Sequence, residues 1–392
     1  MDQKQRSTTI AVHGGTRKDD AFGAINEPIY MTSNYRIPTD GTPVDWSGIN
    51  SNIYQRNRNV NQMVLQDKLC ALIGAEDGAV FASGVAALAA VFTTFLNSGD
   101  HAIVSEVCYS ATNLLFRKYL PEKYAIEVTL LDTTDTEAVR AAVRPNTKLI
   151  HVETPGNPTT GISDLEAIAE IAHAAGALMS VDATFAGPIS LYPLRHGADL
   201  EIHSMTKYIN GHGDSLGGCV LGSRALLEQI KELAMVNYGG ILSPFNAWLI
   251  ARGLVTAPLR MKQHSETALT VSRWLETCPA VRFVWYPGLE SHPQHERAVR
   301  YMNGQYSGMI AFDIAGDEAV HQKLLDSLTL VTHAVSLGDV ESLIVYYDKS
   351  SDKLPHYPAV YREGFFRFSV GLEDAEDIIA DLKQAMEKAG VL

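Results

Sequence analysis

The sequence predicts an α/β protein with a mostly parallel sheet in a large domain and a smaller α/β domain at the C-terminal end. Two observations lead to this fold class. From residue 61 to about 255, short apolar runs of strand length alternate with segments of helical period, and a shorter alternation continues to residue 392. Strands that alternate with helices are typical of parallel sheets with covered faces. We therefore predict an N-terminal arm at 1–60, a first domain at 61–255 and a second domain at 256–392.

The expected elements follow from the spacing of apolar residues along the chain. After a helix at 61–73, the strands of the first domain are expected at 78–82, 102–105, 127–131, 148–152, 178–181 and 198–203. The helices between them are expected at 85–97, 109–120, 135–143 and 165–175. A single helix at 246–275 leads into the last third, which contains strands at 307–314, 343–347 and 366–370 and helices at 321–328 and 374–389.

Residues 1–60 lack a helical period, yet they contain Tyr30, Tyr35, Trp46 and Tyr54. Disordered tails are poor in aromatic residues, because a segment that buries little apolar surface stays unfolded. We therefore expect an arm that packs against another part of the assembly, such as a second subunit.

The composition excludes several kinds of partner. The 392 residues carry a formal net charge of −13, which argues against nucleic acid or an anionic membrane. The N-terminus lacks the apolar core of a signal peptide, and the longest apolar stretch, near Val85–Leu96, is too short to span a bilayer. Four scattered cysteines favour a reduced, cytoplasmic protein. His292 and His295 lack a third ligand, so we expect no metal.

The segment Ser204-Met205-Thr206-Lys207 is the most informative motif, because it directly follows the strand expected at 198–203. The lysine amine can form an imine with an aldehyde, and the two hydroxyls can hydrogen-bond phosphate oxygens. Pyridoxal phosphate carries both of these groups. Serine β-lactamases also use Ser-x-x-Lys, but they need a downstream Lys-Thr-Gly, which this sequence lacks. We therefore predict pyridoxal phosphate as the cofactor.

Asp182 is the acid that this cofactor requires near its pyridine nitrogen. It ends the buried run at 178–181, and ligands of open α/β sheets bind at the carboxyl ends of strands. An aspartate there can hold the ring nitrogen protonated and so make the ring an electron sink. Taken alone, Asp182 could equally be a helix cap or a turn residue. Its place on the strand end before Lys207 favours the cofactor.

Several further residues suit a cofactor or an amino-acid substrate. Gly84 and Val85 open a helix, where free N–H groups and the helix dipole attract phosphate, although an ordinary turn explains this feature as well. Tyr109 follows the next strand and can stack on a ring. Asn157 can donate to the ring oxygen, and the planar fork of Arg367 suits a substrate carboxylate.

Together these motifs resemble the pyridoxal-phosphate-dependent enzymes of cysteine and methionine metabolism, the trans-sulfuration family. This family includes cystathionine γ-synthases, cystathionine γ-lyases, methionine γ-lyases and O-acetylhomoserine sulfhydrylases. The resemblance extends from Tyr54 to about Leu382 and is carried by the segments 204–214, 336–343 and 367–374. It implies the fold type I, transferase-like architecture, a pyridoxal-phosphate-binding domain at 61–255 and a homotetramer built from two dimers.

The resemblance also implies a role for each matching residue. Lys207 would be the Schiff-base lysine, Asp182 the partner of the pyridine nitrogen, and Tyr109 a stacking and proton-exchanging residue. Further cofactor contacts are implied for Gly84, Val85, Asn157, Thr184, Ser204 and Thr206, and, from the neighbouring subunit, Tyr54 and Arg56. Substrate contacts are implied for Arg367, Ser336, Val335 and Asn157.

The cofactor motifs match the family, whereas the substrate motifs depart from it. Val335 stands where cystathionine γ-lyases usually have Glu, and the segment 345–358 replaces a stretch commonly rich in His, Met and Thr. Ala111 replaces a cysteine typical of methionine γ-lyases, and Met235-Val236 replaces a Lys-Asp pair. If these residues line the site, the pocket is small and apolar, and long zwitterionic cystathionine is disfavoured.

We predict γ-elimination or γ-replacement on an α-amino acid with a leaving group at Cγ. The candidate substrates are an O-acyl homoserine, methionine, or an unusual 4-substituted amino acid, for example a halogenated one, of specialised metabolism. A cystathionine β- or γ-lyase is the alternative. A non-catalytic protein on the same fold is disfavoured, because Lys207, Asp182, Tyr109 and Arg367 are all present.

Overall fold

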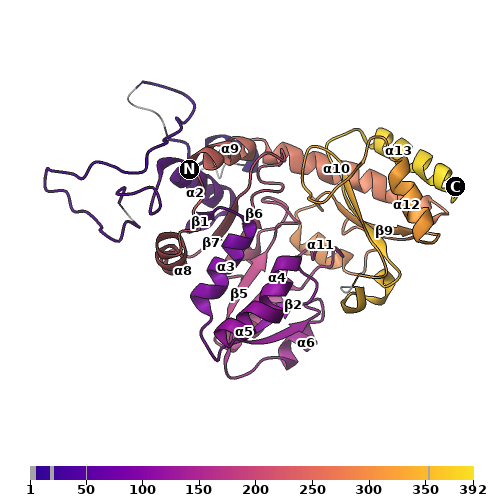
Figure 1. Cartoon of the computed structure of the whole chain (residues 1–392), viewed down its shortest axis with the longest axis horizontal. Helices are drawn as coiled ribbons and strands as arrows, with labels where there is room; N and C mark the ends of the chain where they lie inside the picture. Colours follow the sequence, from indigo (N-terminus) through magenta and orange to yellow (C-terminus); the bar gives the residue numbers. More distant parts are fainter. Residues whose placement is uncertain (1–5, 18–21, 50, 352–353) are drawn as a thin grey trace.

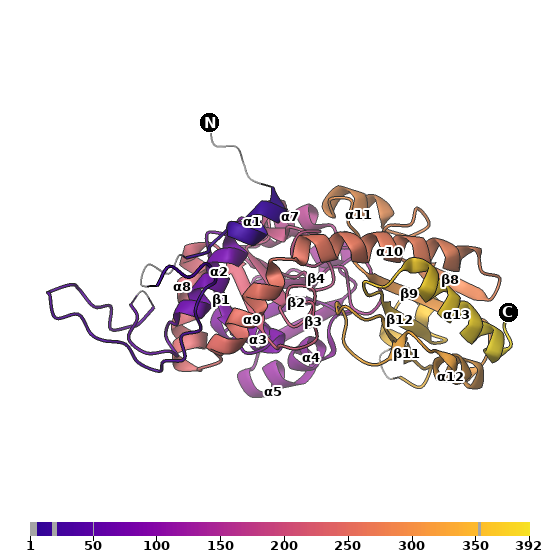
Figure 2. The same cartoon turned by 90° about the horizontal axis from the view of Figure 1, so that it is seen from above.

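The computed structural model describes residues 6–17, 22–49, 51–351 and 354–392. Figure 1 shows an indigo N-terminal arm that projects from a large α/β body, with the smaller C-terminal domain at the opposite end. Figure 2 shows the long helix Ala257–Thr277 (α10) extending from the body over the smaller domain. Parts of two predicted segments lie outside the described residues: 1–5, 18–21 and 50 of the arm, and 352–353 of the segment 345–358.

The large sheet has seven strands among the described residues, in the order β1-β7-β6-β5-β4-β2-β3. All neighbours from β6 to β3 are parallel, whereas β7 runs antiparallel to both β1 and β6. This confirms the mostly parallel sheet, although β7 was not predicted. The strands are Asp77–Phe81 (β1), His101–Ser105 (β2), Glu127–Leu131 (β3), Thr147–Glu153 (β4), Leu178–Asp182 (β5), Leu200–Ser204 (β6) and Gly218–Gly222 (β7).

Helices cover both faces of this sheet, which explains the continuous apolar runs of its strands. On β4, Leu149 packs into the layer of α3, and the next residue, Ile150, packs into the layer of α7. Among the described residues, none of the helices is both long and apolar enough to pass through a lipid bilayer. The helices of this part are Ser7–His13 (α1), Val60–Ile73 (α2), Gly84–Phe95 (α3), Ser110–Leu114 (α4), Leu120–Tyr124 (α5), Thr136–Ala141 (α6), Leu165–Ala174 (α7), Arg224–Ile230 (α8) and Pro244–Leu254 (α9), with the π-helical turns Leu115–Tyr119 (η1) and Lys231–Asn237 (η3) and the 3₁₀ turn Pro193–His196 (η2).

The smaller sheet has the order β10-β11-β12-β9-β8 and is antiparallel except between β10 and β11. One face packs on α10, α12 and α13, and the other face looks towards the large domain. Its strands are Val281–Trp285 (β8), Met309–Ile314 (β9), Thr332–His333 (β10), Leu343–Tyr347 (β11) and Phe365–Ser369 (β12). Its helices are His295–Tyr301 (α11), Glu318–Ser327 (α12) and Ala375–Ala389 (α13), with the 3₁₀ turns Leu354–His356 (η4) and Ala359–Tyr361 (η5).

Two expectations about helices were wrong. The arm contains a short helix, α1, although its sequence lacks a helical period. The helix expected at 246–275 is two helices, α9 and α10, because Pro258 has no N–H to donate to the carbonyl of Leu254. Arg260 bridges the break by donating to the carbonyls of Gly253 and Tyr208. The domain boundary near 255 stays a prediction.

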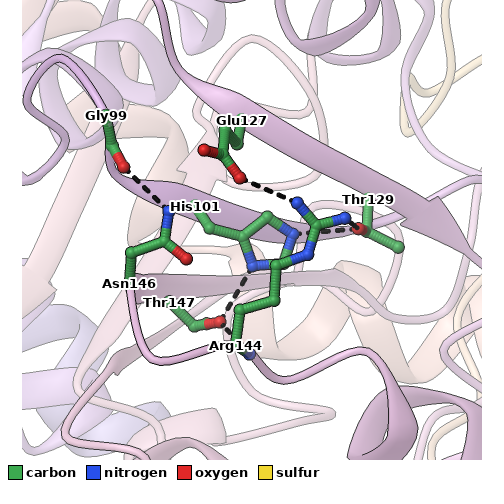
Figure 3. Close-up of polar contacts among 7 residues, drawn as sticks. All are labelled: Gly99, His101, Glu127, Thr129, Arg144, Asn146 and Thr147. Atoms are coloured by element: carbon green, nitrogen blue, oxygen red, sulfur yellow. Dashed lines mark hydrogen bonds and ion pairs between the residues drawn. The ribbon is translucent and has the colours of Figure 1, made fainter.

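The amino ends of the central strands are closed by a polar network (Figure 3). The imidazole of buried His101 makes hydrogen bonds of 2.8 Å to Thr147 Oγ1 and 2.9 Å to Thr129 Oγ1, and Arg144 forms an ion pair of 2.8 Å with Glu127. The burial of His101 lowers the pKa of its imidazole. These contacts occupy the amino ends of β2, β3 and β4. The carboxyl edge of the sheet is the edge at which ligands of open α/β sheets bind.

Buried histidines predict a loss of stability in mild acid. Burial lowers the imidazole pKa of His151 to about 3 and those of His264 and His292 to about 4. The pKa in the unfolded chain is about 6.5, so below this pH the unfolded state takes up protons that the folded state refuses. Each such histidine should therefore reduce the free energy of unfolding by about 1.4 kcal/mol per pH unit below pH 6.5, down to its folded pKa.

Urea unfolding between pH 7 and pH 5 measures this slope. His151→Gln should make the slope shallower, whereas the same change at exposed His333 is the control and should leave it unchanged. An unaltered slope in His151→Gln would show that the buried imidazole is not the source of the acid lability.

Candidate active site

A cavity of about 600 Å³ lies at the carboxyl ends of the central strands, between the large domain and the smaller sheet. Every residue predicted to contact cofactor or substrate within one chain lines this cavity. These residues are Gly84, Val85, Tyr109, Asn157, Asp182, Thr184, Ser204, Thr206, Lys207, Val335, Ser336 and Arg367. The structure thus brings together segments that are far apart in the sequence, although their individual roles stay predictions.

Lys207 lies in the turn that follows β6, and its amine points at the smaller domain. Its Nζ donates a hydrogen bond of 2.7 Å to Ser336 Oγ. Burial, together with the positive charge of Arg367, lowers the pKa of Lys207 to about 8. A larger fraction of this amine is therefore neutral near pH 7 than in an ordinary lysine, which suits a nucleophile or a proton acceptor.

Asp182 ends β5 and is only 5% exposed. Its Oδ1 accepts hydrogen bonds from Thr184 N–H at 2.9 Å and from Thr184 Oγ1 at 2.6 Å, while Thr184 Oγ1 itself accepts from Ser204 N–H at 2.8 Å. Burial raises the pKa of the Asp182 carboxyl. No described residue donates to Oδ2, so one carboxylate oxygen remains for a protonated ring nitrogen.

The start of α3 forms a cradle for an anion. Ser83 caps this helix by accepting from Ala86 N–H at 3.1 Å. The N–H groups of Gly84 and Val85, which precede Ala86, have no partner among the described residues. A Cβ on Gly84 would lie 2.7 Å from the Cβ of Ser204, so only glycine allows the helix to approach the end of β6. The hydroxyls of Ser204 and Thr206 border the same space. This arrangement fits a phosphate group.

Arg367 on β12 has an incomplete set of partners. Its Nη2 donates to the carbonyl of Ser336 at 3.0 Å and its Nη1 to Asn157 Oδ1 at 3.3 Å, whereas its buried Nε has no partner among the described residues. A buried guanidinium with an unused donor suits a carboxylate ligand. Ser336 adopts a φ of +91°, a strained conformation for a residue other than glycine, and it presents its hydroxyl to Lys207.

Tyr54 and Arg56 lie outside this cavity. They border a separate hollow of about 340 Å³ with Gln55, Gly239 and Ile241, and the Arg56 guanidinium carbon lies 5.3 Å from the centre of the Tyr54 ring. Within one chain they therefore do not contribute to the cavity of Lys207. Their role at the site of a neighbouring subunit stays a prediction.

The expected substrate wall needs one correction. Val335 lines the cavity and is 78% exposed at its mouth, but Ala111, Met235 and Val236 do not line it. Met235 is buried in the core cluster of α3, because the π-helical turn η3 rotates it inward. The argument for a small pocket from these positions is therefore wrong. The wall is formed instead by residues of β11 and the following segment, among them Val345, Tyr347 and Tyr357.

Glu153 is a functional candidate that the sequence reasoning missed. It ends β4 beside Asp182, its register partner on β5. Its Oε2 accepts from Tyr109 N–H at 2.7 Å, and its Oε1 accepts from Asn157 N–H at 2.9 Å. Burial, together with the charge of Asp182, raises the pKa of Glu153 well above its usual range. The same signal that marked Asp182, an acid at a strand end, could have found it.

Glu153 should act as a positioning residue. Glu153→Gln replaces one acceptor oxygen by an NH₂ group, so the N–H of Tyr109 or of Asn157 loses its partner. A buried unpaired donor costs about 1–3 kcal/mol, so kcat/KM should fall about 10- to 100-fold while the cofactor stays bound. Glu106→Gln, at a carboxylate that pairs with Arg117 outside the cavity, is the control. Unchanged kcat/KM in Glu153→Gln would remove Glu153 from the site.

The fold and this constellation define a pyridoxal-phosphate-dependent enzyme. A family model described as "Cys/Met metabolism PLP-dependent enzyme" matches residues 8–387, and the chain belongs to this family. Its cofactor is pyridoxal phosphate, as the sequence predicted.

Relatives in this family include two canavanine γ-lyases. The protein of Rhizobium leguminosarum bv. trifolii is 51% identical over 97% of this chain and 95% of its own length, and that of Pseudomonas canavaninivorans is 47% identical over 97% and 96%. An L-methionine γ-lyase of Porphyromonas gingivalis is 40% identical over 97% and 96%. The relatives place this chain among enzymes of γ-elimination or γ-replacement.

Solved structures agree with the fold. The crystal structure of metB from Corynebacterium glutamicum has a TM-score of 0.89 at 36% identity and covers 98% of each chain. Cystathionine γ-lyase from Lactobacillus plantarum, complexed with L-serine, has a TM-score of 0.89 at 33% identity, covering 98% of this chain and 100% of its own. The predicted fold type I architecture is confirmed.

Proposed function

We propose that this protein is a canavanine γ-lyase, which cleaves the bond between Cγ and oxygen in canavanine. The observation that carries this proposal is the difference in identity among the relatives. The two canavanine γ-lyases are 51% and 47% identical to this chain, whereas an L-methionine γ-lyase and a cystathionine γ-lyase from Bacillus subtilis are 40% and 39% identical. Canavanine carries a guanidinooxy group on Cγ, so it belongs to the unusual 4-substituted amino acids, one of the three candidate substrate classes, although this polar group does not match the small, apolar pocket expected from the departures in sequence.

The residues of the cavity suit the first steps of such a reaction. When bound, pyridoxal phosphate supplies an electron sink for carbanions at the substrate. Arg367 would hold the substrate carboxylate through its unused Nε donor. Lys207, with its pKa lowered to about 8, would take the proton from Cα, and Asp182 would hold a proton at the ring nitrogen through Oδ2.

Departure of the leaving group needs a proton at its oxygen. Tyr109 and Lys207 both line the cavity, and both residues carry a transferable proton. Protonation of the departing oxygen releases hydroxyguanidine. Water then completes the reaction, either by adding at Cγ to give homoserine or, after elimination, by hydrolysis to 2-oxobutanoate and ammonia.

Product analysis tests this proposal. The holoenzyme should convert canavanine into hydroxyguanidine together with homoserine or 2-oxobutanoate, detected by mass spectrometry. If canavanine stays intact while cystathionine yields an amino-acid thiol and a keto acid, the alternative of a cystathionine β- or γ-lyase replaces the proposal.

We further propose a homotetramer of two dimers that works in the cytoplasm. Tyr54 and Arg56 lie in the N-terminal arm, outside the cavity of their own chain, and the arm projects from the body (Figure 1). All four cysteines are free thiols, which suits a reducing compartment. In a dimer, the arm of one subunit would bring Arg56 to the phosphate cradle of the other.

Subunit mixing checks this arrangement. Arg56→Ala and Lys207→Ala should each be nearly inactive, but a hybrid dimer has one site in which both residues are intact. After random re-association about one quarter of all sites should be intact, so a corresponding share of activity should return. Mixing Lys207→Ala with Asp182→Asn is the control, because both residues lie in one cavity of the same chain. Hybrids confirmed by native mass spectrometry without recovered activity would contradict the dimer proposal.

A further inference from the structure

The cavity has a wall of tyrosines that the cofactor does not require. On β11, Val345 pairs in register with Arg367 of β12, and Tyr347 pairs with Phe365, so these four side chains share the face that looks towards the large domain. Tyr346 points the other way and stacks on His321 in the core, with ring centres 4.6 Å apart. Tyr347 therefore lies about 7 Å along the strand from Val345, the register partner of the carboxylate-binding candidate Arg367.

The segment after β11 adds Tyr357 to this wall, whereas Tyr361 lies outside the lining of the cavity. Tyr357 and Tyr361 both pack edge-on against Phe365, at ring-centre distances of 6.3 Å and 4.6 Å, and Tyr347 stacks on the same ring at 5.1 Å. Phe365 thus holds all three tyrosines in place. Tyr347 and Tyr357, which line the cavity, come from the part of the sequence that departs from the family, the segment 345–358.

The three hydroxyls differ in their partners. Tyr361 donates a hydrogen bond of 2.7 Å to the carbonyl of Thr159, so its hydroxyl has a structural role. The hydroxyls of Tyr347 and Tyr357 have no hydrogen-bond partner among the described residues, although Tyr357 is only 6% exposed and lines the cavity. Neither oxygen is among the buried polar atoms that lack a partner, so both hydroxyls remain accessible and are free to bond a ligand in the cavity.

The charges around the cavity decide what that ligand group can be. Among the described residues that line it, only Glu153 and Asp182 are carboxylates. Glu153 accepts hydrogen bonds from the backbone N–H groups of Tyr109 and Asn157. Asp182 ends β5 and is the predicted partner of the cofactor's ring nitrogen. Among the described residues that line this cavity, a cationic group on the substrate therefore finds no carboxylate beyond these two, which are assigned to the backbone and to the ring nitrogen. It finds aromatic rings and two hydroxyl oxygens, which attract a guanidino group through cation–π contacts and by accepting its N–H groups.

We propose that Tyr347 and Tyr357 form the subsite for the distal guanidino group of the substrate, an inference that rests on the proposed canavanine cleavage. Burial raises the pKa of Tyr357, so its hydroxyl stays protonated and accepts through its lone pairs. In this subsite hydroxyl oxygens and ring faces replace the carboxylate that commonly pairs with a guanidinium. Recognition by tyrosine also avoids a strong ion pair that would hold the leaving group after it departs.

Binding of two uncleaved amino acids to the holoenzyme tests the subsite. L-Arginine has a guanidino group and a CH₂ in place of the canavanine oxygen, whereas L-norleucine has an apolar side chain without N–H groups. Calorimetry should give a Kd for arginine that rises about tenfold in Tyr357→Phe and several-fold in Tyr347→Phe. The Kd for norleucine should stay within about twofold. Tyr361→Phe is the matched control, and it should change neither Kd.

The outcomes separate the subsite from the proposed reaction. Turnover of canavanine by the unmodified enzyme tests the reaction alone. If Tyr357→Phe weakens the binding of arginine and of norleucine equally, or the binding of neither, the proposed subsite is contradicted even when canavanine is cleaved. If arginine binding weakens selectively but canavanine is not cleaved, the subsite stands and the proposed reaction fails.

Discussion

Lys207→Ala should abolish turnover while leaving the fold intact. The amine of Lys207 donates a hydrogen bond to Ser336 of the smaller domain, and the pKa of this amine is lowered to about 8. Loss of its proton transfers alone should cost about 10⁴-fold in kcat, at the upper end of general acid–base contributions. The visible absorbance of lysine-bound cofactor should disappear as well. Alanine removes one hydrogen bond at a turn, so the far-ultraviolet spectrum should be unchanged.

Lys262→Ala is a matched control for this substitution. Lys262 lies on α10 in an exposed pair with Glu266, away from the cavity, so its loss should alter neither absorbance nor turnover. A Lys207→Ala protein that keeps its colour and its activity would show that the cofactor is held elsewhere.

Asp182→Asn should have the second largest effect. The amide has nearly the same shape, and its oxygen can still accept from Thr184, but it carries no negative charge towards the ring position. Preorganised charges of this kind are worth about 10²- to 10³-fold, so kcat/KM should fall by this factor or more. The predicted phosphate contacts at Gly84 and Ser204 are not altered by this change, so the cofactor should remain bound.

The comparison that isolates this charge is Asp199→Asn. Asp199 lies outside the cavity and accepts from Met179 N–H at 2.7 Å, so it holds the start of β5 and not its end. Asp199→Asn should lower stability without a comparable loss of kcat/KM per folded enzyme. Near-normal turnover in Asp182→Asn would remove Asp182 from the catalytic set.

The residues expected to contact the cofactor could be located from the sequence, because their positions at strand ends can be recognised from the neighbouring residues alone. Asp182 ends β5 and Lys207 lies in the turn that follows β6, and parallel strands bring their carboxyl ends to one edge. The same logic reaches Glu153, which was overlooked because a buried acid next to Asp182 has no single obvious role. Residue types at strand ends therefore locate a site before any tertiary contact is known.

The substrate half could not be predicted in this way. Tyr357 enters the cavity only because η4 and η5 fold back over Phe365, an arrangement without periodicity in the sequence. Met235 was expected in the wall, but the π-helical turn η3 turned it into the core. Strand β7 was also missed, because its glycines, Gly218 and Gly222, weaken the strand signal even though close packing against Ser83 and Asp199 requires them. Such features depend on tertiary contacts and not on local pattern.

A side-by-side measurement of kcat/KM on canavanine, methionine, O-acetylhomoserine and cystathionine tests the central claim most directly. All four share the α-amino and α-carboxylate groups that Arg367 and Lys207 would contact, so differences report on the leaving group alone. We expect canavanine to exceed each of the others by at least about tenfold, a difference of about 1.4 kcal/mol in transition-state stabilisation. A preference of the same size for cystathionine or methionine would contradict the proposed function.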